Sequence, residues 1–131
     1  GASAAGNPTT YASTADGWFK AGIAASMDEV GVAPATRDAY ITANGTLTGT
    51  VDQQLEQIIE EKYIAVFGVS VEPWTDYRRT GYPVLTIPAN AFGGVSAVPR
   101  SLFYPQSEID LNPNCPAQKP ANLQSKVFWD N

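Results

Sequence analysis

The distribution of proline divides this chain into two parts. Six prolines follow Pro83, and apart from a single possible turn at residues 107–111 that stretch shows no helical or strand periodicity. Proline lacks a backbone N–H and clashes with the preceding turn, so a stretch this rich in proline cannot continue as regular helix. The stretch nevertheless contains large apolar side chains: Phe92, Leu102, Phe103, Tyr104, Ile109, Phe128 and Trp129. We therefore expect residues 84–131 to form an ordered, extended tail wrapped over a helical body rather than a disordered segment.

The residues before Pro83 carry helical signals instead. Apolar side chains recur there at intervals of three and four residues. This pattern predicts helices at about residues 14–30, 36–43, 51–67 and 71–80. Because only a short turn separates the last two, we expect them to lie antiparallel as an αα-hairpin. The predicted fold class is mostly α, a helical hairpin with a long proline-rich irregular tail over it.

Capping residues predict where these helices begin and end. We expect Pro34 to break the chain and Thr36 to begin the second helix. Gly45, which tolerates positive φ, is expected to end that helix. Thr50 and Gln53 fit a capping box at the start of the third helix.

Charge and composition exclude several classes of function. The net charge is −5 and only eight Lys and Arg residues are present, whereas a nucleic-acid backbone must be neutralised by clustered basic side chains. The chain has no histidine, which excludes Ser-His and Cys-His nucleophiles and imidazole metal sites within it. Cys115 is alone, so neither an intramolecular disulfide nor a thiolate metal cage can form. We therefore expect no catalytic residue, no metal, no cofactor and no nucleic-acid partner.

Ordered blocks of sequence resemble one known family. The string Glu-Pro-Trp-Thr-Asp-Tyr-Arg-Arg-Thr-Gly-Tyr-Pro at residues 72–83 closely resembles the segment that marks SusD/RagB proteins. Residues 55–67 are similar to the Gln/Glu-rich helix that precedes this segment in the family. Residues 99–112 resemble its proline, arginine and tyrosine block, and residues 127–130 its aromatic end. Residues 21–27 also look like an upstream helix of the family, so the resemblance covers nearly the whole chain.

The residues that match these blocks are interpreted as structural. They are Trp74, Asp76, Arg78, Arg79, Gly81, Pro83, Pro99, Arg100, Tyr104, Pro105, Glu108, Asn112 and Trp129. Arg78 and Arg79 could instead clamp a ligand, because guanidinium groups suit carboxylates and sugar hydroxyls. We favour pairing of one of them with a nearby acid, which can be Asp76, Glu72 or Glu108, since members of the family share this string although their ligands differ.

Aromatic side chains are the other candidates for contact with a sugar. Trp18 and Trp74 lie within apolar helix faces, so we expect them to pack in the core. Trp129 is expected to anchor the C-terminus. Loops on a rigid scaffold are where binding residues concentrate. The candidate ligand contacts are therefore loop residues: Tyr11, Asn90 and Phe92.

The resemblance implies a scaffold of tetratricopeptide-like helix pairs at the cell-surface side of a Gram-negative outer membrane. It implies a binding protein that captures glycans and delivers them to a SusC-type TonB-dependent transporter. Family members are much longer, so we expect this chain to be the C-terminal part of such a protein, with membrane contact only through a lipid anchor on the part that is absent. Two alternatives stay open. One is a peptide-binding member of the family, and the other is a helical-repeat interaction module without its own ligand.

Overall fold

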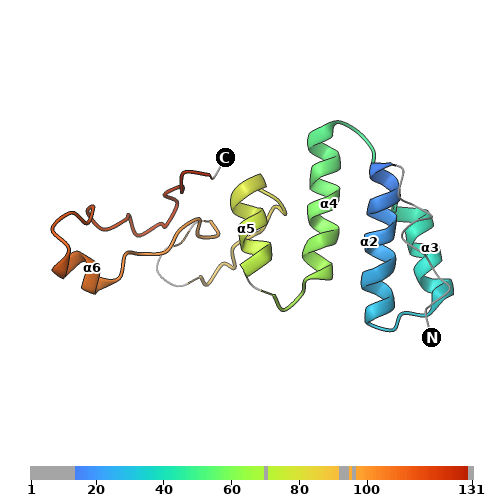
Figure 1. The fold of residues 1–131 in the computed structure, drawn as a ribbon, viewed down its shortest axis with the longest axis horizontal. Helices are drawn as coiled ribbons and strands as arrows, with labels where there is room; N and C mark the ends of the chain where they lie inside the picture. The colour runs from blue at the N-terminus through green and yellow to red at the C-terminus, as the bar shows by residue number, and fades with distance from the viewer. Residues whose placement is uncertain (1–13, 70, 92–94, 96, 130–131) are drawn as a thin grey trace. The chain divides into compact units, whose positions relative to one another are not determined.

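A computed structural model describes residues 14–69, 71–91, 95 and 97–129 of the chain. In these ranges the helices are α2 (Ala15–Glu29), α3 (Pro34–Asn44), α4 (Val51–Ala65), α5 (Val71–Thr80) and α6 (Gln106–Leu111), and no strand occurs (Figure 1). The mostly α fold class is therefore confirmed. The chain divides into two compact units, Gly1–Pro73 and Trp74–Asn131. Because the boundary falls inside α5, the antiparallel hairpin expected for α4 and α5 stays a prediction.

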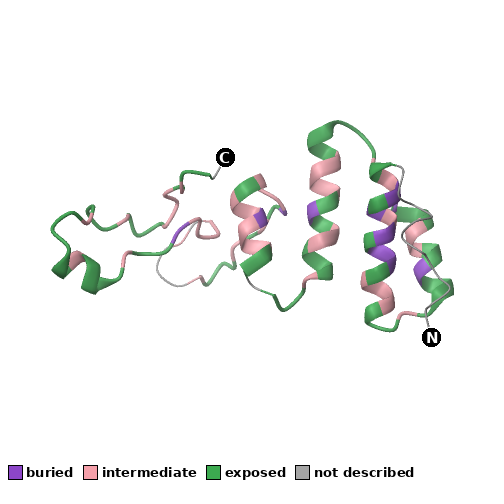
Figure 2. Cartoon of the chain, viewed as in Figure 1, coloured by how far each residue is buried: buried purple, intermediate pink, exposed green. Residues whose placement is uncertain are grey.

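Helix α2 is the centre of the first unit. It contacts both α3 and α4, with α3 running antiparallel and α4 parallel to it (Figure 1). The buried apolar side chains are concentrated on α2, where they include Phe19, Ile23 and Ala24, while α4 contributes Ile59 (Figure 2). Burying a side chain such as Ile23 stabilises the fold by about 1.5–3 kcal/mol, so α2 carries much of the core of this unit.

Local capping fixes the starts of two helices. Thr14 accepts a hydrogen bond from the backbone N–H of Gly17 at 3.1 Å and so begins α2. At α4 the hydroxyl of Thr50 accepts from the N–H of Gln53 at 3.3 Å, and the side chain of Gln53 accepts from the N–H of Thr50 at 2.8 Å. This reciprocal pair is the predicted capping box.

Two predictions about α3 are wrong. The helix begins at Pro34 rather than Thr36, because proline at the first helical position gives up an N–H that would have no intrahelical partner. Gly45 follows the helix with a φ of −80°, not a positive value. A Cβ at this buried position would lie 2.6 Å from the carbonyl oxygen of Ile41 and 2.9 Å from Cγ of Lys20. Close packing, and not backbone handedness, therefore requires a glycine here.

The second unit consists of the greater part of α5, the short helix α6 and irregular chain. Gly81 follows α5 with a φ of +84°, which favours glycine, and the buried Pro83 comes directly after. Two distant tail segments lie together because the N–H groups of Arg100 and Ser101 both donate to the carbonyl of Leu123, at 2.9 and 3.2 Å. Outside α6, the described part of the proline-rich tail is thus held by scattered hydrogen bonds rather than by regular structure.

Candidate functional site

The most specific sequence motif converges on one arginine in the second unit. The guanidinium carbon of Arg78 lies 3.8 Å from the ring centroid of Trp74 and 4.4 Å from that of Trp129. Both distances are well within the range of a cation–π interaction. Trp74 and Arg78 lie on α5, whereas Trp129 belongs to the end of the tail. We call Trp74, Tyr77, Arg78, Arg100 and Trp129 the motif cluster.

Hydrogen bonds to backbone carbonyls fasten the tail to this cluster. The indole N–H of Trp74 donates to the carbonyl of Pro99 at 2.6 Å. Arg100 donates to the carbonyl of Arg78 at 2.8 Å, and its guanidinium carbon lies 5.3 Å from the ring centroid of Tyr77. The two motif blocks, 72–83 and 99–112, therefore meet through Trp74, Pro99 and Arg100.

The neighbouring arginine has a different environment. Arg79 forms an ion pair with Asp76 at 3.0 Å, and the Asp76 carboxylate is buried while Arg79 is more than half exposed. The backbone carbonyl of Asp76 also accepts from the hydroxyl of Thr80 at 2.7 Å. Of the acids named from the sequence, Asp76 thus pairs with an arginine, while Glu72 pairs with Lys62 at 3.0 Å.

The remaining motif residues gather around α6. Pro105 precedes this helix, and Glu108 accepts a hydrogen bond from Asn112 at 3.2 Å. The backbone of Tyr104 exchanges two hydrogen bonds with the side chain of Gln118, at 2.9 and 3.0 Å. These contacts hold the tail locally, and they are of the kind expected for a structural role.

A separate feature lies in the first unit, where a cleft of about 740 Å³ opens between α2 and α4. Its walls are mostly apolar and include Trp18, Ile23 and Met27 from α2 and Ile58 and Ala65 from α4. Trp18 is 59% exposed, so the prediction that it packs in the core is wrong. The reason is geometric, because Trp18 lies on the face of α2 where the two helices leave this space between them.

One polar pair lies in the wall of the cleft. The hydroxyl of Tyr40, on α3, donates a hydrogen bond of 2.7 Å to the carboxylate of Glu61, on α4. This hydrogen bond, together with burial and the negative charge of Glu61, raises the pKa of Tyr40 to about 12. The pair therefore places a carboxylate and a neutral phenol in a mostly apolar wall that also contains Ser26 and Lys62.

Raising the pH from about 10 to about 12 is expected to destabilise the first unit. A group whose pKa is raised on folding contributes its full stabilisation below its unfolded pKa, here 10.0, and loses it as the pH passes its folded value, here about 12. Ionised Tyr40 would place a second negative charge 2.7 Å from Glu61. Phenolate absorbance should show one late-titrating tyrosine, and Tyr40→Phe should remove that late step. An unchanged late step in Tyr40→Phe would show that the hydrogen bond does not form in solution.

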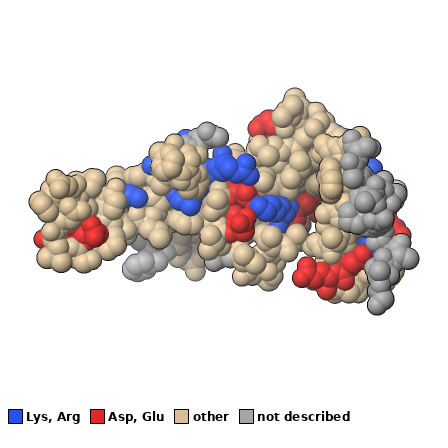
Figure 3. All heavy atoms as spheres, viewed as in Figure 1, with Lys and Arg blue, Asp and Glu red and all other residues tan. Residues whose placement is uncertain are grey.

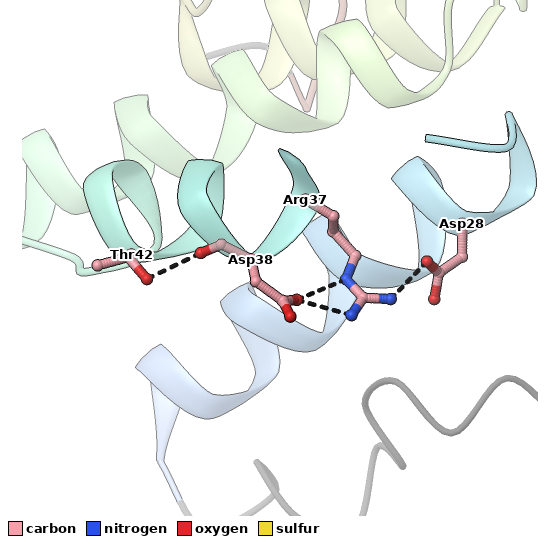
Figure 4. Close-up of polar contacts among 4 residues, drawn as sticks. All are labelled: Asp28, Arg37, Asp38 and Thr42. Atoms are coloured by element: carbon pink, nitrogen blue, oxygen red, sulfur yellow. Dashed lines mark hydrogen bonds and ion pairs between the residues drawn. The ribbon is translucent and has the colours of Figure 1, made fainter. Parts of the chain in front are cut away.

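A buried arginine joins α2 to α3. Arg37 is 4% exposed, and its guanidinium lies 2.6 Å from one carboxylate oxygen of Asp28 and 2.6 Å from one of Asp38 (Figure 4). Hydrogen bonds to Asp38 and then to Asp28 raise the pKa of Arg37 above its ordinary value. The arginine therefore stays charged and serves the packing of these two helices.

The predicted loop contacts are only partly within the described residues. Asn90 is exposed in a turn, where the N–H of the next residue donates to the carbonyl of Pro88 at 3.0 Å. Tyr11 and Phe92 lie outside the described residues. On the face drawn in Figure 3, basic side chains are scattered among uncharged and acidic ones and do not form one continuous patch. No cluster of His, Cys, Asp and Glu suited to a metal ion occurs in the described part of the chain.

Sequence reasoning did not single out Arg37, Tyr40 or the cleft. Arg37 and Asp28 are nine residues apart, and Tyr40 and Glu61 are 21 apart on different helices. No local pattern links such pairs. The polar residues within otherwise apolar helix faces were the only available signal.

A family model described as starch-binding and associating with the outer membrane, the SusD-like model, matches residues 3–105. The match covers most of the chain and includes α2 to α5 as well as Pro99 and Arg100 of the second motif block. No curated protein and no solved structure matches the chain. Among the residues described, no helix has the length and apolar character that crossing a bilayer requires.

Proposed function

The chain belongs to the SusD-like family of starch-binding proteins that associate with the outer membrane, and we propose that it takes part in non-catalytic capture of nutrient glycans at the cell surface. In this proposal a lipid anchor holds the protein at the cell-surface side of the outer membrane. The captured glycan is then passed to a TonB-dependent transporter of the SusC type. The chain acts as scaffold for this capture and not as an enzyme.

The family match over α2 to α5 is the observation that carries this proposal. The most specific residues of the sequence motif support a scaffold role. The described contacts of Trp74 and Arg78 are with other side chains and with the backbone of the tail. The sequence contains no histidine, which leaves the usual nucleophile systems without their base. Together these features favour binding by the assembled protein over chemistry in this part of it.

Calorimetric titration of the full-length protein with maltoheptaose, a starch fragment, tests the proposal. We expect saturable binding and a higher melting temperature, since a ligand at a hundredfold excess over its Kd stabilises a protein by about 2.7 kcal/mol. Binding of peptides but not of glycans would assign the protein to the alternative, peptide-binding class. Binding of neither, with co-purification of a partner protein, would assign it to an interaction module. Turnover of the oligosaccharide would overturn the non-catalytic assignment.

Of the three loop candidates for ligand contact, only Asn90 lies among the described residues. We propose that it contacts the glycan, because it is exposed in a turn of the second unit. Asn90→Ala should weaken maltoheptaose binding without changing the melting temperature of the free protein. Asn114→Ala, also exposed in a turn of the same unit, is the matched control and should bind as the parent does.

A further inference from the structure

We propose that the cleft between α2 and α4 is a binding site for a small apolar molecule that carries a hydrogen-bond donor. This ligand is different in kind from the glycan proposed above, and the site lies wholly within the first unit. The proposal is based on the volume of the cleft, on the composition of its walls, and on the Tyr40–Glu61 pair in it.

The size and walls of the cleft suit a small organic ligand. Its volume of about 740 Å³ is within the roughly 300–1,000 Å³ typical of ligand pockets, which commonly lie between packed helices. Ile23 and Met27 on α2 face Ile58 and Ala65 on α4 across this space, and the exposed Trp18 lies at its surface. Such walls offer dispersion contacts and few hydrogen bonds.

The chemistry of the ligand follows from the one carboxylate in the wall. Glu61 accepts the Tyr40 hydroxyl with one oxygen, and no other described contact involves its second oxygen. A donor such as an amine N–H or a hydroxyl can therefore bind there. Lys62 is the other charged residue in the wall, and because it pairs with Glu72 at 3.0 Å, an anionic group would still be repelled by Glu61. A glycan fits less well, because its many hydroxyl groups would be buried against apolar walls without partners.

Gly22 helps to keep the cleft open. It lies in the interior of α2 and lines the cleft, and a Cβ at this position would meet no atom within 4 Å. Glycine in a helix interior is less favourable than alanine, because it loses more backbone freedom on folding. No neighbouring helix comes close enough to Gly22 to require a glycine there. A larger side chain at this position would instead occupy the open space of the cleft.

Binding of N-phenyl-1-naphthylamine, a neutral apolar dye with one N–H donor, tests the proposal on the full-length protein. We expect saturable binding to one site, with fluorescence enhancement of the dye and energy transfer from Trp18. Gly22→Leu should fill the cleft and weaken dye binding by about tenfold or more, which corresponds to about 1.4 kcal/mol. Gly22→Ala, which adds only a methyl group, is the matched control and should retain most of the affinity. Ser26→Leu fills the same cleft one turn further along α2 and repeats the test at a second position.

A comparison of a neutral dye with an anionic dye tests whether the carboxylate of Glu61 disfavours anions in the cleft. The anionic dye 8-anilinonaphthalene-1-sulfonate should bind more weakly than the neutral dye, and Glu61→Gln should narrow that difference. Equal dye affinity in the parent, Gly22→Leu and Ser26→Leu proteins would overturn the proposal. Dimerisation that Gly22→Leu abolishes would also overturn it and assign the cleft to a second copy of the chain. Maltoheptaose binding should be unchanged in Gly22→Leu, which separates this site from the proposed glycan function.

Discussion

Arg78→Ala is expected to lower the free energy of unfolding by about 2–3 kcal/mol, measured by denaturant titration. The substitution removes both cation–π contacts, to Trp74 at 3.8 Å and to Trp129 at 4.4 Å, each worth roughly 0.5–2 kcal/mol according to its exposure. It also leaves the two indole rings without the flat group that fills the space beside them. The end of the tail should therefore detach from α5, and the intrinsic fluorescence should shift towards that of solvated tryptophan.

Two variants at and beside this position separate the causes. Arg78→Lys keeps the positive charge but not the planar guanidinium, so it should show an intermediate loss of stability. Arg79→Ala removes a side chain that is more than half exposed and pairs within one helix turn, so its effect should be about 1 kcal/mol or less. If Arg78→Ala and Arg79→Ala both leave stability unchanged but abolish glycan binding, these arginines contact the ligand and the structural interpretation is wrong.

Local signals predicted the parts of the fold that are decided locally. The Thr50–Gln53 pair begins α4 as the sequence indicates, because a cap involves residues only three positions apart. The proline-rich stretch is irregular for an equally local reason, the missing N–H of each proline. The predicted start of α3 at Thr36 is wrong because the missing N–H of Pro34 is harmless in the first turn of a helix, where the observed helix begins.

Features that depend on packing between helices were not predictable in the same way. Trp18 follows the helical spacing of its apolar neighbours, yet it is exposed because the cleft between α2 and α4 opens beside it. Tyr40 and Glu61 meet only because of how α3 and α4 are placed around α2. The motif cluster was predictable only in part. The resemblance identified its residues, but the sequence did not show that Arg78 lies beside the rings of Trp74 and Trp129.

Arg37→Ala is expected to lower the melting temperature by roughly 5–10 °C, because it removes a buried guanidinium and leaves the half-buried Asp28 and the exposed Asp38 without their counter-charge. Arg37 is almost fully buried between Asp28 and Asp38 (Figure 4). Asp28 lies in the last turn of α2, where a negative charge is unfavourable beside the negative end of the helix dipole. Without the guanidinium, that repulsion is no longer offset. Calorimetry on the parent and variant proteins measures the change.

A double-mutant cycle shows whether the pair itself is responsible. Asp28→Asn alone should destabilise the protein less than Arg37→Ala, because Arg37 keeps its second partner, Asp38, at 2.6 Å. In the double variant the unfavourable charge of Asp28 is gone together with the arginine, so the combined loss should be smaller than the sum of the two single losses. Strictly additive losses would show that Arg37 stabilises the α2–α3 junction by packing of its aliphatic stem. Arg37→Met, which keeps that stem but not the charge, should then resemble the parent, whereas the ion-pair explanation requires it to resemble Arg37→Ala.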